Sequence, residues 1–164
     1  ESPIGSFVWD YFSLQASDKK LTTKLYSSLQ QIAETHFLRE YQQILALFAD
    51  LFAKLNAESD CPINYDEEAG LPALFKAFDV KIEQESGLLE KLLLFVRLQT
   101  AFFNTKCFFF ANLKTVLTER SLSAFYHEMQ LNDVCIFLLE NTQKPKLPSE
   151  IVTIIDRDLC EIIA

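Results

Sequence analysis

The fold is decided by the stretch Lys106-Cys107-Phe108-Phe109-Phe110-Ala111-Asn112. This run is too short for a helix face and shows no alternation of apolar and polar residues, so we expect helices on both faces of a central strand. A second apolar run, from Asp133 to Glu140, follows a helix-length segment at 118–131. Strand, crossover helix and strand form a βαβ unit, and functional groups usually gather at the carboxyl ends of such strands. The sequence therefore predicts an α/β fold with a mixed sheet and flanking helices, with Asn112 and Glu140 at the edge to inspect first.

Length and composition indicate one domain, or one domain with a helical appendage. The chain has 164 residues, of which 49% are hydrophobic and 15 are phenylalanine, which predicts a bulky aromatic core. No apolar run reaches the roughly 18 residues needed to span a bilayer, and no signal peptide is visible. The opening residues Glu1-Ser2-Pro3 do not look like a natural start.

Cysteine and charge place the chain in the cytoplasm and limit its partners. Its four cysteines are scattered without a CxxC pair, which favours free, reduced thiols over disulfides or zinc. Lysine and arginine number 15 against 23 acidic residues, a formal net charge of −8. This charge argues against a uniformly basic nucleic-acid binder, but it leaves room for a local basic groove or one built by oligomerisation.

The first half of the chain has helical periodicity. A helix begins near Lys19, after the capping pair Ser17-Asp18, and its buried face carries apolar residues at spacings of four, four and three, namely Leu21, Leu25, Leu29 and Ile32. The pattern continues to about residue 57, which is long for one helix. We therefore predict a break near Thr35-His36 and a packed antiparallel helix pair, with an extended helical arm as the alternative.

The second half predicts shorter elements. We expect strands at 63–65 and 79–83, helices at 71–78 and 88–103, and two short strands within 151–163 that turn at 156–158. Ser86 is the expected cap of the helix at 88–103.

Catalytic signatures are missing from the sequence. It contains no GxxxxGK[ST], GxGxxG, GxSxG or HExxH motif, and neither His36 nor His127 lies in a recognisable motif. Glu140 ends an apolar strand as a Walker B carboxylate does, but without a phosphate loop a polar strand terminus is the simpler interpretation.

Two clusters of charged residues each allow a structural and a functional interpretation. Asp60, Asn64, Asp66, Glu67 and Glu68 supply oxygen donors that suit calcium, although Asp66 can equally cap a helix while Glu67 and Glu68 complement its dipole. Scattered lysines usually form a solvated face, although they can also line a DNA groove; the candidates are Lys19, Lys20, Lys24, Lys54, Lys76 and Lys81.

The runs Ile63-Asn64-Tyr65-Asp66-Glu67 and Leu74-Phe75-Lys76-Ala77-Phe78-Asp79-Val80-Lys81-Ile82-Glu83 carry a resemblance to a known family. With the strand at 133–140 and the closing Ile154-Ile155-Asp156-Arg157-Asp158-Leu159, the chain from about residue 7 resembles the CRISPR-associated Csn-two family, the spacer-acquisition accessory proteins of subtype II-A loci. The resemblance implies an α/β head similar to a nucleoside-triphosphatase fold without its phosphate loop, and a helical leg. Family members carry further strands before the point where this chain begins.

The resemblance also implies a function. Such proteins form homotetrameric rings, stabilised by calcium, that thread double-stranded DNA from its free ends without catalysis. They cooperate with the spacer integrase complex and the RNA-guided nuclease of the same locus. The corresponding division of this chain is 1–16 for the start of the head, 17–58 for the leg and 59–164 for the remaining head.

Site residues follow from the matching positions. The implied calcium ligands are Asp66, Glu67 and Glu68, with Asp60 nearby, although Pro72-Ala73 departs from the family pattern. The implied phosphate contacts are first Lys76 and Lys81, and second Lys19, Lys20 and Lys24.

Two other functions are compatible with the same residues. One is a degenerate nucleotide hydrolase that uses Glu140, and the other is a structural adaptor that binds only proteins.

Overall fold

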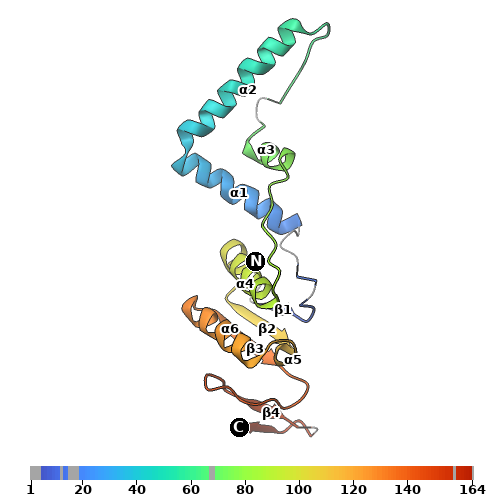
Figure 1. Ribbon diagram of the computed structural model, residues 1–164, viewed down its shortest axis with the longest axis vertical. Helices are drawn as coiled ribbons and strands as arrows, with labels where there is room; N and C mark the ends of the chain where they lie inside the picture. Colours follow the sequence, from blue (N-terminus) through green and yellow to red (C-terminus); the bar gives the residue numbers. More distant parts are fainter. Residues whose placement is uncertain (1–4, 12, 15–18, 67–68, 157, 164) are drawn as a thin grey trace. The chain divides into compact units, whose positions relative to one another are not determined.

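Figure 1 shows the computed structural model, which describes residues 5–11, 13–14, 19–66, 69–156 and 158–163. The chain divides into two compact units. One contains Glu1–Ala16 and Glu83–Ala164, here called the head, and the other contains Ser17–Ile82, here called the helical unit. Within the described ranges, none of the helices has the length and apolar character that crossing a membrane requires.

A three-stranded parallel sheet organises the head. Its strands are β1 (Ser6–Val8), β2 (Cys107–Ala111) and β3 (Cys135–Leu139), in the order β1-β2-β3, with β2 in the centre. The register places Phe7 beside Phe109, and Phe109 beside Phe137. The α/β fold and the two strands expected around 107–112 and 133–139 are confirmed, and this sheet is entirely parallel in the described residues.

Two helices cover one face of this sheet. They are α4 (Leu88–Phe103) and α6 (Glu119–Leu131), which match the expected helices at 88–103 and 118–131. The core between them and the sheet is aromatic: Phe108, Phe110 and Phe125 are fully buried, and the rings of Phe110 and Phe125 meet edge to face at 5.4 Å. Thr118 caps α6, because its Oγ1 accepts a hydrogen bond from the Ser121 N–H at 3.2 Å.

The opposite face of the sheet is open in the described residues, so the expectation of helices on both faces is wrong. Phe137 and Phe7 are 48% and 49% exposed, and Trp9 is 71% exposed. Successive side chains of a strand point to opposite faces, and α4 and α6 both lie on the Phe108 side. The strands read as continuous apolar runs because both faces of the sheet carry apolar side chains. Such a run does not show whether one face or both faces are covered by helices. The same arrangement leaves Cys135 exposed, although its strand was expected to be buried.

The chain ends in an antiparallel hairpin of β4 (Thr153–Ile155) and β5 (Glu161–Ile163), which confirms the two short strands expected there. Asp156 closes the turn, since its Oδ1 accepts from the N–H groups of Asp158 at 2.9 Å and Cys160 at 2.8 Å.

The helical unit begins with α1 (Lys19–His36) and α2 (Leu38–Glu58), which are separated at Phe37 by non-helical dihedral angles, φ −131° and ψ 35°. The predicted break is confirmed. The predicted antiparallel pair is wrong: in Figure 1 the two helices diverge from their junction, and among the described residues no side chain of α2 is buried. Phe37 joins the two helices without a loop, because its N–H donates to the Ala33 carbonyl and its carbonyl accepts from the Tyr41 N–H. The junction therefore contains no turn that would bring α2 back along α1.

The short helix α3 (Leu71–Ala77) confirms the helix expected at 71–78, and it packs against α1. The Tyr26 hydroxyl donates to the Val80 carbonyl at 3.0 Å, and its ring lies 5.6 Å from that of Phe75. These contacts place the segment up to Ile82 in the helical unit, whereas the division made from the sequence ended the leg at residue 58.

The strands expected at 63–65 and 79–83 are absent from the described residues. One backbone N–H in each segment finds its acceptor without a neighbouring strand: the Ile63 N–H donates to Asn56 Oδ1 at 2.8 Å, and the Val80 N–H donates to the Phe75 carbonyl at 2.8 Å. Asp79 adopts φ 50°, which turns the chain back toward α3.

Candidate nucleic-acid interface

The amino-terminal half of α1 presents a lysine face. Lys19, Lys20 and Lys24 are exposed, and the helical repeat places them opposite the buried Leu21 and its apolar neighbours. No acidic residue occurs between Lys19 and Ala33, so the lysines carry the only formal side-chain charges in this part of the sequence.

These lysines oppose the favourable charge pattern of a helix. The amino-terminal end of a helix carries a partial positive charge and prefers acidic side chains, yet the first turn of α1 contains none. Lysine charge there costs the helix a little stability. The same charge adds to the helix dipole, and the sum attracts anions such as phosphate.

Lys76 and Lys81 lie near α3. Lys76 is exposed in the last turn of α3, which Tyr26 and Phe75 hold against α1. Lys81 is exposed and its ammonium lies 2.6 Å from the Asp79 carboxylate, and this hydrogen bond raises the pKa of Lys81. Lys81 must therefore leave Asp79 before it can contact a phosphate, whereas no ion pair is recorded for Lys76 among the described residues. All five predicted DNA-binding lysines fall in the helical unit and are exposed.

The predicted calcium ligands are not gathered into a site by the described residues. Asp60 is exposed just beyond the end of α2, whereas Asp66 follows Tyr65, whose ring stacks on Phe52 of α2 at 4.5 Å. Glu67 and Glu68 lie outside the described residues. Among the residues that are described, no group of three or more His, Cys, Asp or Glu side chains is placed to hold a metal ion. Asp60 and Asp66 alone therefore do not fit a calcium site.

The carboxyl edge of the sheet brings Asn112 and Glu140 together, as the βαβ pattern predicts. Asn112 adopts φ 57° and begins α5 (Leu113–Val116), a short helix that the sequence did not reveal. Glu140 Oε1 accepts from the Lys114 N–H at 2.9 Å, and Asn112 Oδ1 accepts from the Asn141 N–H at 3.1 Å. This geometry supports the simpler interpretation of Glu140, a polar strand terminus that here holds a helix end.

One oxygen of Glu140 is nevertheless buried without a hydrogen-bond partner among the described groups, namely Oε2. Tyr11 follows β1 at the same edge, and its hydroxyl donates to the Ala111 carbonyl at 2.5 Å. Burial, and then the nearby charge of Glu140, raise the pKa of Tyr11 to about 12. Tyr11 is therefore neutral and fixed at neutral pH, and it serves as a structural donor.

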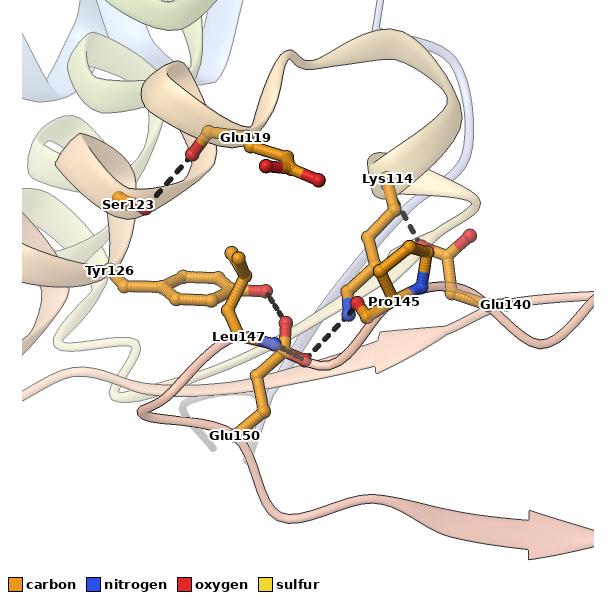
Figure 2. A network of polar contacts seen from close by, with 8 residues as sticks. All are labelled: Lys114, Glu119, Ser123, Tyr126, Glu140, Pro145, Leu147 and Glu150. Carbon is orange, nitrogen blue, oxygen red and sulfur yellow. Dashed lines mark hydrogen bonds and ion pairs between the residues drawn. The ribbon is translucent and has the colours of Figure 1, made fainter. Parts of the chain in front are cut away.

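Figure 2 shows a polar network next to this edge that sequence reasoning missed. The Lys114 ammonium and the Glu150 carboxylate lie 2.6 Å apart, and each side chain is 10% exposed. The Tyr126 hydroxyl donates to Glu150 Oε1 at 2.6 Å, and the Leu147 N–H donates to Oε2 at 2.9 Å. Lys114 also donates to the Pro145 carbonyl at 2.9 Å. No motif signalled these residues, because 36 positions separate Lys114 from Glu150.

The network is electrostatically self-satisfied. Burial alone raises the pKa of Glu150, but the hydrogen bonds from Lys114, Tyr126 and Leu147 outweigh burial and leave the pKa below its usual value. Burial, and then the bond to Glu150, raise the pKa of Tyr126. The Glu150 carboxylate therefore stays ionised, and both of its oxygens accept hydrogen bonds. We call the network of Lys114, Tyr126, Leu147 and Glu150 the clasp, and its role is structural.

The geometry defines an α/β protein with a parallel sheet and a separate helical unit that bears exposed lysines. The family model described as CRISPR-associated protein (Cas_Csn2) matches residues 3–159. The chain belongs to this family, the Csn-two family that its sequence resembles, and it is therefore CRISPR-associated. No curated protein matches the chain significantly.

Proposed function

We propose that this protein is a non-enzymatic accessory protein of CRISPR spacer acquisition that binds linear double-stranded DNA as a homotetrameric ring. The observation that carries the proposal is the lysine face of α1, formed by Lys19, Lys20 and Lys24. Lys76 is also exposed, and it lies on α3, which packs against α1. Membership of a CRISPR-associated family supports the biological setting.

A net charge of −8 is compatible with this function. Affinity for a duplex comes from the counterions that local lysines displace from phosphates, so only the contacting surface needs to be positive. A ring places several copies of the same modest surface around one duplex, and the effective concentration of the later contacts multiplies a weak individual affinity.

The exposed apolar side of α2 supports self-association. Ile44, Phe48, Leu51 and Leu55 follow spacings of four, three and four, and they are 38%, 37%, 49% and 47% exposed. This spacing is typical of a helix that packs lengthwise on another helix. The same surface is the specific observation that favours the second candidate function, an adaptor that binds only proteins.

Calcium remains part of the proposal as a bridge between acidic copies. Divalent ions bound by carboxylates would reduce the repulsion between protomers of charge −8. Because Asp60 and Asp66 do not complete a site, further ligands must come from Glu67, Glu68 or a second copy. If calcium has this role, chelation lowers the mass of the particle in solution and weakens DNA binding together.

The protein acts in the cytoplasm with the spacer integrase complex and the RNA-guided nuclease of its locus. The engagement of Glu140 with the Lys114 N–H supports a role without nucleotide hydrolysis.

A mobility shift with linear and covalently closed duplex tests the proposal. We expect the linear duplex to bind, the closed circle to bind poorly, and Lys76→Glu to weaken binding. The matched control is Lys54→Glu, which makes the same charge change at an exposed lysine of α2 that pairs with Asp50. Equal binding of both DNA forms would contradict end threading, and equal binding of both variants would exclude Lys76 from the interface.

A further inference from the structure

Two cysteines lie side by side at the start of adjacent strands. Cys107 begins β2 and Cys135 begins β3, and the two are Cα partners in the parallel register. Partners in a parallel pair project their side chains from the same face, so both thiols lie on one side of the sheet. The Cys135 N–H donates to the Lys106 carbonyl at 2.8 Å, which fixes this register at its first residue.

The spacing suits a disulfide. Neighbouring strands lie about 4.8 Å apart, which falls within the range of roughly 4.4–6.8 Å for the Cα atoms of bonded cysteines. The two thiols are close enough to influence one another: burial, and then the electrostatic effect of the neighbouring Cys135, raise the pKa of Cys107. Closing the bond therefore requires side-chain rotation rather than movement of the strands.

The pair is accessible from the open face of the sheet. Cys135 is exposed and Cys107 is half-buried, and the described helices of the head pack on the opposite face. Two positions along, Phe109 and Phe137 stack at 5.0 Å with 12° between their planes, which holds the two strands together beside the thiols. Cys61 lies in the helical unit and Cys160 in the β4–β5 turn, so neither occupies a strand position next to this pair.

We propose that Cys107 and Cys135 form a dithiol site that closes to an intramolecular disulfide on reaction with a low-molecular-weight disulfide. The exposed Cys135 thiolate attacks the small disulfide, forms a mixed disulfide and releases one small thiol. The Cys107 thiol then loses its proton and attacks the Cys135 sulfur, which releases the second small thiol. Two protein thiols are oxidised and one small disulfide is reduced to two thiols, so atoms and electrons balance.

The closed form ties the central strand of the sheet to its neighbour. A cross-link between distant positions in the chain restricts the unfolded state more than the folded state. For a chain of this size we expect the Tm to rise by on the order of 5–10 °C. A reducing agent reverses the change.

The experiment uses the full chain carrying Cys61→Ser and Cys160→Ser, reduced and then treated with oxidised glutathione. We expect the intact mass to fall by two hydrogens, peptide mapping to recover a linked Cys107–Cys135 pair, and the Tm to rise until dithiothreitol is added. Adding Cys107→Ser to this background should trap one glutathione on Cys135. Three results with the protein that carries only Cys61→Ser and Cys160→Ser would each overturn the proposal. They are the retention of two glutathiones per chain, the absence of any reaction, and a disulfide between two chains.

Discussion

The Lys114 ammonium lies 2.6 Å from the Glu150 carboxylate, with both side chains 90% shielded from solvent. This contact joins α5 to the segment that follows β3 (Figure 2). A buried pair of this kind is favourable only when its other hydrogen bonds are made, and here Tyr126 and the Leu147 N–H complete the shell of Glu150. The clasp therefore fixes the segment that leads to the β4–β5 hairpin.

Removing one partner of the clasp should destabilise the protein strongly. Lys114→Met leaves the Glu150 carboxylate buried and without its cation, and we expect a loss of about 3 kcal/mol in the free energy of unfolding, measured with urea. The control is Lys144→Met, at a half-buried lysine that precedes Glu150 in the same segment and forms no ion pair among the described residues, for which we expect less than about 1 kcal/mol. Equal losses would show that the clasp contributes no specific stability.

Stability should fall in acid because of Glu150. Its pKa in the folded protein is lower than the usual 4.5, so its contribution is complete above that pH. The contribution is lost as the pH falls through the lower, folded-state pKa. Urea unfolding at a series of pH values should show this acid loss, and Glu150→Gln should flatten it. An unchanged profile in the variant would assign acid sensitivity to other carboxylates.

Stability should also fall at high pH because of Tyr11. Its pKa is raised from 10.0 to about 12, so its contribution is complete below pH 10 and is lost as the pH rises through about 12. Tyr11→Phe cannot ionise there and should remove that part of the alkaline loss. The check is the pH dependence of the urea midpoint for both proteins, and parallel curves would contradict the assignment.

Aromatic residues on the two faces of the sheet should differ in their contribution to stability. Phe110 is fully buried, and Phe110→Ala should cost about 3–5 kcal/mol through lost burial and the cavity that remains. Phe137 is 48% exposed on the next strand, and Phe137→Ala should cost well under half as much. Similar losses in urea unfolding would indicate that the open face is covered in solution.

Assembly should depend on the apolar side of α2. Leu51→Glu places a charge among Ile44, Phe48 and Leu55, and we expect the mass measured by light scattering to fall from about four protomers toward one. Gln42→Glu is the control, because it adds the same charge on the opposite side of the helix. If the Leu51→Glu variant remains a tetramer, the interface between protomers lies on another surface.

The sequence predicted the elements whose signals are local. The run from Cys107 to Asn112, the helix at 88–103 and the turn at Asp156 each carry their own periodicity or turn chemistry, and all three are present. The strands expected at 63–65 and 79–83 failed because apolar alternation does not reveal whether a partner strand exists.

The site was less predictable for the same physical reason. Exposure of the lysines on α1 follows from helical periodicity alone, and the structure bears it out. The clasp between Lys114 and Glu150 depends on tertiary contacts between distant positions, and no spacing rule marks it. The ion pair of Lys81 with Asp79 was likewise not foreseen, because residues two apart approach one another only where the backbone turns, and the positive φ of Asp79 was not predicted.

The salt dependence of binding to a linear duplex tests the central claim most directly. The logarithm of affinity is plotted against the logarithm of salt concentration. Each phosphate that the protein neutralises contributes about 0.9 to the magnitude of the negative slope. We predict a steep negative slope for the protein, and one shallower by at least about 2 for the combined variant Lys19→Gln, Lys20→Gln and Lys24→Gln. Identical slopes for the two proteins would contradict the claim that the lysine face of α1 contacts DNA.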